Sequence, residues 1–266
     1  MKHGVTVWNW AEPGKPLAAL VQELAGMGFE VMSFLPGQLL SLSHAQSRAL
    51  LAVLDGYRLP ATVHGTCDLE PDMIERIVTL LGRRLLAFTL DPLLRTDSRG
   101  TLYAVNAMVA LLQVIQASTR GTGVRFGIED FPLDPLALDY YREELEPVLE
   151  SPRFGILLDV GHMNLRMAQE DYFASDVGDY IAGLPLPIVE VHVHDNRGDR
   201  DSHEPLGAGD IPFPAVAGAL MAVGFDGVST IEIAPSFHGS TPAASRAHLQ
   251  RTFEVWRGML EARRYG

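Results

Sequence analysis

The sequence has little of several residue types on which whole classes of proteins depend. Its 266 residues include one cysteine, Cys67, so an internal disulfide framework is excluded and a reducing cytoplasm is the expected compartment. Lysine occurs only as Lys2 and Lys15, which makes Schiff-base chemistry deep in a site unexpected. No apolar run approaches the roughly 18 residues of a membrane span, and the start lacks the apolar segment of a signal peptide.

Positive charge is also scarce. The formal net charge at pH 7 is −12, and the sequence contains no run of basic residues. Proteins that bind nucleic acids usually carry a basic surface that neutralises phosphates, so a nucleic-acid partner is disfavoured. The composition favours a small-molecule substrate and leaves a homo-oligomer open.

Short β-rich segments alternate with segments of helical spacing along the chain. Eight strands are predicted, at 4–8, 29–34, 60–65, 85–90, 124–130, 154–159, 188–194 and 228–233. Helices are predicted at 16–27, 44–56, 101–118, 136–150, 170–182, 214–223 and 242–262, with one more that begins at Pro71. Eight βα units in a chain close to the typical length of about 250 residues predict a single (β/α)8 TIM barrel domain over 1–266. An open doubly wound sheet is the alternative, but it requires a glycine-rich loop after the first strand, which WNWAEPG does not provide.

Ionisable residues fall on the inward face of the predicted strands. Successive strand side chains point to opposite faces, so three valines of 188–194 share one face while Glu190, His192 and His194 share the other. The C-terminal end of barrel strands is where barrel enzymes carry their active sites. The same alternation places one ionisable side chain inward near that end of four further strands: His64, Glu129, Asp159 and Glu232.

The convergence of these side chains predicts a metal site. Carboxylates that meet inside a barrel raise one another's pKa values, and buried charges without partners are costly. A divalent cation removes both problems. Taken alone, each glutamate is as well explained by an arginine partner, and His64 is better explained as a hydrogen-bonded core histidine. Five coincident placements favour a functional site instead.

Several short motifs strengthen this interpretation by their order along the chain. The motifs are GIED ending at Glu129, DxGH from Asp159 to His162, HxHDN from His192, DSH from Asp201 to His203, and STIEIAP around Glu232. Together they resemble the xylose isomerase-like TIM barrel superfamily, which contains sugar phosphate isomerases and epimerases, inosose dehydratases and the family 2 apurinic endonucleases. The resemblance extends from the third to the eighth predicted strand, and it is specific for the superfamily but not for a substrate.

The resemblance implies one divalent metal ion per chain. Mixed carboxylate and imidazole ligands suit Mn²⁺, Zn²⁺, Co²⁺ or Fe²⁺. The implied ligands are Glu129, Asp159, His192 and Glu232. In the endonucleases, further metals have ligands that match His64, His162, Asp201 and His203 here, which are therefore expected to contact a substrate or a second metal. One more histidine is expected at the end of the fourth strand, where this sequence has Thr89-Leu-Asp91; this departure disfavours a complete three-metal site.

The resemblance also implies the reaction. We expect an isomerase or epimerase of a small sugar, sugar phosphate or related polyhydroxy carbonyl compound, with a metal-stabilised enediolate and with Glu129 and Glu232 as the acid and base. His162 and Arg197 would hold the oxyanion, although Arg197 fits a solvated loop charge equally well. Trp8 fits either an aromatic wall over a sugar or a core residue. The alternatives are a zinc-dependent endonuclease-like phosphodiesterase, an inosose-type dehydratase and a non-catalytic binding barrel.

Overall fold

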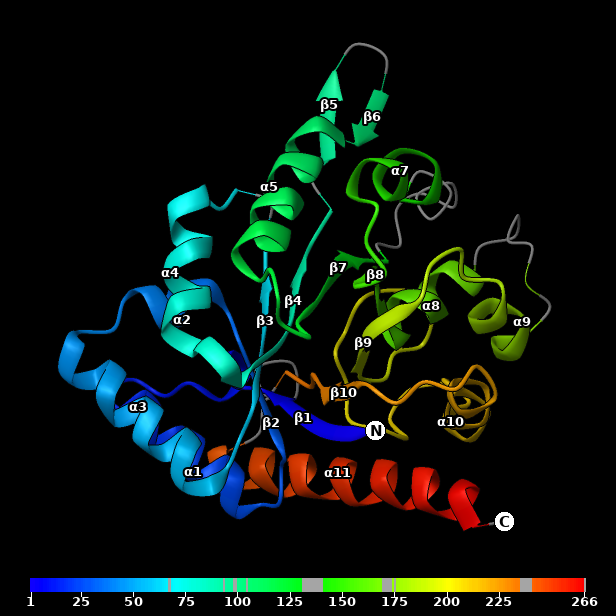
Figure 1. Cartoon of the computed structure of the whole chain (residues 1–266). Helices are drawn as coiled ribbons and strands as arrows, with labels where there is room; N and C mark the ends of the chain where they lie inside the picture. Colours follow the sequence, from blue (N-terminus) through cyan, green and yellow to red (C-terminus); the bar gives the residue numbers. More distant parts are fainter. Residues whose placement is uncertain are drawn as a thin grey trace.

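Eight parallel strands close into a barrel in the structure, a computed structural model (Figure 1). It describes residues 1–66, 68–92, 94–97, 100–103, 105–130, 141–168, 174, 176–234 and 241–265. The strand order is β1-β10-β9-β8-β7-β4-β3-β2, and the pairing of β1 with β10 closes the ring. The predicted (β/α)8 barrel is therefore confirmed, and the open sheet is excluded. The barrel strands are β1 (Lys2–Thr6), β2 (Val31–Phe34), β3 (Ala61–Gly65), β4 (Leu85–Leu90), β7 (Arg125–Glu129), β8 (Phe154–Asp159), β9 (Ile188–Val193) and β10 (Val228–Ile231).

Helices surround the barrel, and the long α11 passes beside β1 (Figure 1). None of the described helices is long and apolar enough to cross a membrane. The α-helices are α1 (Leu17–Gly26), α2 (Pro36–Leu40), α3 (His44–Tyr57), α4 (Pro71–Leu81), α5 (Val105–Ser118), α7 (Glu146–Leu149), α8 (Val160–Met167), α9 (Val177–Ala182), α10 (Phe213–Ala222) and α11 (Pro242–Tyr265). Short turns of other helix types are η1 (Trp8–Trp10), η2 (Gly82–Arg84) and η3 (Tyr141–Leu145).

Local sequence signals set several helix ends. The Ser43 side chain accepts a hydrogen bond from the backbone N–H of Gln46, and the Gln46 side chain accepts one from the backbone N–H of Ser43. This reciprocal pair is a capping box, and it begins α3. Pro71 is the first residue of α4. Gly28 follows α1 with φ of +99°, a conformation that glycine adopts without strain.

The segments after β4 and β8 differ from the prediction. The helix expected over 101–118 begins only at Val105, because 100–103 forms β6 (Gly100–Tyr103), which pairs antiparallel with β5 (Leu94–Asp97). This hairpin stands away from the barrel (Figure 1), and its threonine and tyrosine residues favour a strand. Helix α8, directly after β8, was not predicted. Residues 136–140, 170–173 and 175 of two expected helices lie outside the described residues, as does Cys67.

The barrel interior is polar rather than filled with aliphatic side chains. Glu190 Oε1 accepts hydrogen bonds from Thr62 Oγ1 (2.8 Å) and Thr230 Oγ1 (2.6 Å). Strands β3 and β9 are not neighbours, so the first of these bonds crosses the interior. Barrels of this type are usually filled by valine, isoleucine and leucine. The polar side chains at the C-terminal strand ends therefore continue into the interior of the barrel.

Gly155 on β8 marks a close approach between strands. A Cβ built there would overlap the carbonyl oxygen of Pro187 and lie 2.9 Å from Val189 Cγ1. That carbonyl accepts the backbone N–H of Ile156 at 2.9 Å and cannot move without separating β8 from β9. Gly155→Ala is therefore expected to lower the free energy of unfolding by about 1–3 kcal/mol, measured by urea denaturation.

The matched control is Gly56→Ala on the exposed side of α3. A Cβ at Gly56 meets nothing within 4 Å. Alanine is the better helix former by about 0.5–1 kcal/mol, so this variant should be slightly more stable than the wild type. Gly155→Ala with wild-type stability would contradict the close approach of the two strands.

Candidate metal centre

Four adjacent strands end in the side chains that were predicted to bind metal. Glu129 is the last residue of β7 and Asp159 the last of β8. His192 is the penultimate residue of β9, and Glu232 directly follows β10. Because these strands are parallel neighbours, the four side chains meet at the C-terminal end of the barrel. Glu129, Asp159, His192 and Glu232 are called the strand-end cluster below.

His192 Nδ1 faces all three carboxylates of the strand-end cluster. It lies 2.6 Å from Glu232 Oε2, 3.8 Å from Glu129 Oε1 and 4.0 Å from Asp159 Oδ2. None of the four residues is more than 7% exposed. Among the described residues, Nδ1 has no hydrogen bond of normal geometry, the Glu232 contact included. A buried imidazole nitrogen that faces carboxylates without a hydrogen bond fits a divalent cation.

Burial and neighbouring charges move the pKa values of the two glutamates in opposite directions. Burial, and then the charge of Asp91, holds the pKa of Glu129 well above its usual range. Burial also acts to raise the pKa of Glu232, but His192 and His203 outweigh it and the pKa is lowered. The two carboxyl groups on the outer members of the cluster therefore differ in their affinity for a proton.

The pKa values of the two inner members of the cluster, Asp159 and His192, also move in opposite directions. Burial acts to raise the pKa of Asp159, but His194 and His162 hold it well below its usual range. Burial acts to lower the pKa of His192, but Glu232 reverses the effect and raises it to about 9. Without a metal, the cluster therefore holds a proton on His192 at neutral pH.

Asp159 is also fixed by the backbone around it. Its backbone N–H donates to Asp130 Oδ1 at 2.6 Å, and its Oδ1 accepts the backbone N–H of His162 at 2.8 Å, which caps α8. Tyr180 donates its hydroxyl hydrogen to Asp130 Oδ2 at 3.1 Å. Burial raises the pKa of Asp130 to about 7, although His162 opposes it. Asp130 thus helps to fix the position of Asp159 in the cluster.

His64 borders the strand-end cluster rather than an apolar core. Its Nε2 lies 2.8 Å from Asp91 Oδ1 and 3.9 Å from Glu129 Oε2. Asp91 directly follows β4, where the resemblance expects a histidine. The Trp8 ring is 6.2 Å from the His64 ring and 6.3 Å from the His192 ring, between centroids. Trp8 therefore forms an aromatic wall beside the cluster.

A second group of ionisable side chains lies next to the first. Asp201 Oδ2 is 3.3 Å from His162 Nε2 and 3.0 Å from His203 Nε2, and Asp201 Oδ1 is 3.6 Å from His194 Nε2. His194 joins the two groups, because its Nε2 lies 2.9 Å from Asp159 Oδ1. His162, His194, Asp201 and His203 are called the second cluster below.

His194 was not predicted as a site residue. Its ring stacks on that of His203, with 4.0 Å between centroids and 17° between planes. A Cβ at Gly161 would overlap the His194 ring, so the glycine of DxGH makes room for it. His194 could have been predicted from the two-residue spacing of HxHDN, which places it on the same face as His192, together with that glycine.

Asp195 holds the loop that carries Asp201 and His203. Its Oδ2 accepts the backbone N–H groups of Gly207 (2.8 Å) and Gly209 (2.9 Å). Its Oδ1 accepts those of Asn196 (2.9 Å) and Ile211 (3.3 Å). One buried carboxylate thus gathers four backbone donors and sets the path of the loop.

Arg197 lies outside both clusters. Its side chain is exposed, and Nη2 donates to the carbonyl oxygen of Ala208 at 2.6 Å. This position matches the loop-charge alternative, whereas the oxyanion role would need the side chain to turn inward.

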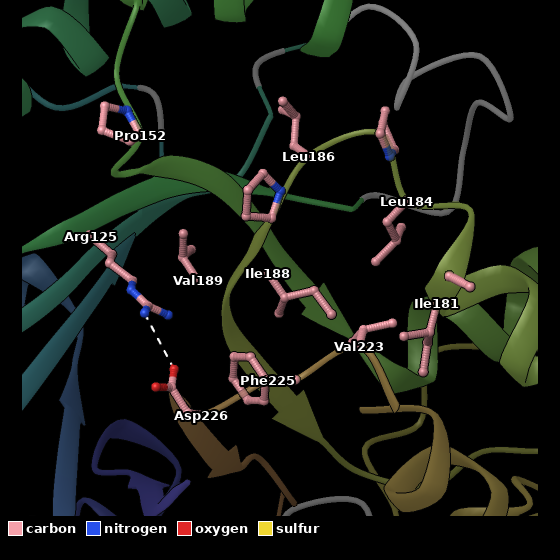
Figure 2. Close-up of a pocket in the computed structure, with 14 residues that line it drawn as sticks. Arg125, Pro152, Ile181, Leu184, Leu186, Ile188, Val189, Val223, Phe225 and Asp226 are labelled. Atoms are coloured by element: carbon pink, nitrogen blue, oxygen red, sulfur yellow. Dashed lines mark hydrogen bonds and ion pairs between the residues drawn. The ribbon is translucent and has the colours of Figure 1, made fainter. Parts of the chain in front are cut away.

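A cavity of about 490 Å³ lies at the opposite end of the barrel (Figure 2). Its lining includes Arg125 at the start of β7, Ile188 at the start of β9, and Phe225. Arg125 and Asp226 are the ionisable side chains of the lining, and they pair with each other at 3.3 Å (Figure 2). Carboxylates and imidazoles do not converge on this cavity, so the strand-end cluster is the better candidate for catalysis.

Zinc binding to the strand-end cluster is expected to release protons. The pKa of His192 in the metal-free protein is about 9, so a zinc ion must displace a proton at pH 7. The apparent zinc affinity should rise with pH up to about pH 9, by about tenfold per pH unit for each proton released. Calorimetric titration in buffers of different ionisation enthalpy measures the protons released, and the expected stoichiometry is one zinc per chain.

Two variants test this prediction. His192→Ala should remove most of the zinc affinity, while Arg197→Ala should bind as the wild type does because Arg197 lies outside both clusters. An affinity that stays constant between about pH 6 and 8 would show that no protonated histidine is a ligand.

Comparisons with known proteins agree with the barrel fold. An uncharacterized protein of Methanocaldococcus jannaschii is 25% identical over 236 residues, which are 81% of this chain and 78% of that protein. The D-psicose 3-epimerase of Clostridium cellulolyticum H10, solved with D-tagatose, has a TM-score of 0.73 at 16% identity, with 98% of this chain and 99% of that chain covered. The IOLI protein, solved with a zinc atom, has a TM-score of 0.65 at 14% identity, with 97% and 96% covered. These identities establish the fold alone. A family model matches residues 99–254, more than half of the chain, and the chain therefore belongs to the xylose isomerase-like TIM barrel family.

Proposed function

We propose that the protein is a metal-dependent isomerase or epimerase of a small sugar, sugar phosphate or related polyhydroxy carbonyl compound. The observation that carries this proposal is the convergence of one imidazole and three carboxylates at the ends of four adjacent strands. This donor set suits Mn²⁺, Zn²⁺, Co²⁺ or Fe²⁺ better than Mg²⁺. The structural likeness to an epimerase and to a zinc-containing protein also supports a metal-dependent isomerase or epimerase.

Glu129 and Glu232 are the proposed acid and base. They come from β7 and from the end of β10, on either side of Asp159 and His192, so a substrate carbon between them would face one carboxylate on each side. When bound, a divalent cation would supply Lewis acidity to a carbonyl oxygen and the adjacent hydroxyl. One glutamate removes the proton of that carbon, and the other delivers a proton to the opposite face, which inverts the configuration.

The position of the two lysines supports proton transfer by carboxylates. Lys2 begins β1 and lies at the opposite end of that strand from the clusters. Lys15 Nζ is 3.3 Å from Glu12 Oε1 and also pairs with Glu23. Neither lysine is placed to act in the site, so proton transfer falls to the carboxylates and imidazoles of the two clusters.

Trp8 and the second cluster provide contacts for a substrate. The Trp8 ring offers an apolar face of the kind that packs against the C–H groups of a sugar. The imidazoles of His162 and His203, held by Asp201, offer donors to hydroxyl or phosphate oxygens. A dehydratase would use the same site, with loss of hydroxide after proton removal.

Replacing either glutamate by glutamine tests the assignment. Glu129→Gln and Glu232→Gln keep the size of the side chain and one ligand oxygen but remove the basic carboxylate. Each should lower turnover, and exchange of the substrate α-hydrogen with deuterium, by about 10²–10⁴-fold at saturating metal. NMR of a panel of ketoses and ketose phosphates in deuterium oxide measures both.

The matched control is Glu261→Gln, which makes the same chemical change on the exposed face of α11 and should leave both rates unchanged. If either cluster variant exchanged hydrogen at the wild-type rate with saturating metal, the two-glutamate mechanism would be wrong. His162 would then be the best remaining base.

A phosphodiesterase that acts on damaged DNA is the second candidate, because the second cluster could hold a further metal. The ligand atoms of His194, Asp201 and His203 lie within 4.8 Å of one another. The net charge of −12 opposes binding to a polyanion.

We therefore expect weak binding to duplex DNA with an abasic site at physiological salt, and little or no cleavage. A nicking assay with zinc-loaded protein, combined with elemental analysis, measures this. Efficient nicking by a protein with two or three zinc ions per chain would replace the first proposal by the second.

A further inference from the structure

A buried carboxylate that the proposed mechanism does not use lies below the strand-end cluster. Glu190 precedes His192 by two residues on β9, so both side chains point into the barrel. Glu190 is fully buried, and its Oε1 accepts the hydroxyl hydrogens of Thr62 and Thr230. A carboxylate in this position costs more free energy than an aliphatic side chain unless its hydrogen bonds are made.

Those two hydrogen bonds use only one of the carboxylate oxygens. Glu190 Oε2 is buried and has no hydrogen-bond partner in the part of the chain that the structure describes. The neighbouring group above it is the imidazole of His192, whose Nε2 lies 4.0 Å from Glu190 Oε1. His192 Nε2 is likewise buried without a partner among the described residues. The ring nitrogen and the carboxylate group are thus near each other inside the barrel, beyond the N–H···O range of about 2.7–3.2 Å.

The two nitrogens of His192 have different neighbours. Nδ1 faces the three carboxylates of the strand-end cluster, and Nε2 faces Glu190. A neutral imidazole carries one proton, and a proton on Nδ1 would remove the lone pair that a metal ion needs. A carboxylate next to Nε2 favours the tautomer with the proton on Nε2.

We propose that Glu190 is a positioning residue that accepts the Nε2–H of His192, directly after a small side-chain shift or through one water molecule, and so keeps Nδ1 free for the metal. The proposal rests on the proposed function, since it assumes that the strand-end cluster binds a cation. Histidine ligands commonly donate their second N–H to a carboxylate, and loss of that partner costs about 10–100-fold in metal affinity.

Zinc titration of Glu190→Gln is the first test. The amide keeps the shape of the side chain and an oxygen acceptor for the threonine hydroxyls, but it is a poorer acceptor for His192. The zinc affinity measured by calorimetry should fall about 10–100-fold. Ser33→Ala is the matched control. Ser33 pairs in register with Thr62, is equally buried, and has no hydrogen-bond partner for its hydroxyl among the described residues. Its removal should leave the zinc affinity unchanged.

The second test reads the imidazole itself. Long-range ¹H–¹⁵N NMR of protein labelled at histidine, with His192 assigned by the loss of its signals in His192→Asn, reports which nitrogen carries the proton. In zinc-loaded wild type we expect zinc on Nδ1 and a slowly exchanging, downfield proton on Nε2. In Glu190→Gln that proton should move upfield and exchange faster with water, a change that a merely structural role of Glu190 would not produce.

The outcomes separate this inference from the proposed function. Zinc on Nε2 of the wild type, or an unchanged Nε2 proton and zinc affinity in Glu190→Gln, would overturn the role of Glu190 and leave the metal site standing. A wild type that binds none of Zn²⁺, Mn²⁺, Co²⁺ and Fe²⁺ would defeat the proposed function. The Nε2 proton of the metal-free protein, compared between wild type and Glu190→Gln, would then still decide whether Glu190 holds the ring. If Glu190→Gln failed to fold, the wild-type spectrum would be the test: a slowly exchanging proton on Nε2 supports the role of Glu190, and a rapidly exchanging one overturns it.

Discussion

Repulsion between buried carboxylates is the constraint on which the C-terminal end of this barrel depends. Parallel strands that end side by side bring Glu129, Asp159 and Glu232 around His192, with almost no access to solvent. In the metal-free protein, burial and the neighbouring carboxylates raise the pKa of Glu129, and Glu232 raises that of His192 to about 9 against the effect of burial. A divalent cation would replace the protons that these groups hold with two positive charges on one ion, which all four side chains would share.

Contacts with surrounding residues hold the side chains of the two clusters in place. Asp195 fixes the loop that carries Asp201 by accepting four backbone N–H groups. Gly161 leaves the space that the His194 ring fills, and His194 in turn contacts Asp159. The geometry of the two clusters therefore depends on residues outside them, and a change at Gly161 would displace the ring of His194, which joins the two clusters.

The sequence was sufficient to predict features that depend on one strand and on the barrel topology. Strand alternation placed Glu129, Asp159 and His192 inward, and closure of the barrel then brought them together. Features that depend on contacts between distant segments could not be predicted. The direction of Arg197 is decided by a carbonyl eleven residues away, at Ala208. The second strand of the β5–β6 hairpin lies where an apolar helical pattern begins. Its strand conformation depends on pairing with β5, which the local pattern does not reveal.

The balance of charge also distinguishes the two clusters as metal sites. The strand-end cluster sets three carboxylates against one imidazole, so protons alone leave it with excess negative charge. The second cluster sets the carboxylate of Asp201 against three imidazoles. Burial acts to lower the pKa of His162 and of His203, but neighbouring carboxylates outweigh it. Asp159 and Asp201 raise the pKa of His162 to about 9. Asp201 and Glu232 raise the pKa of His203 to about 10. At neutral pH these protons already neutralise Asp201, and a cation placed there would have to displace them. A single ion should therefore prefer the strand-end cluster, which leaves His162 and His203 protonated and able to donate hydrogen bonds to a substrate.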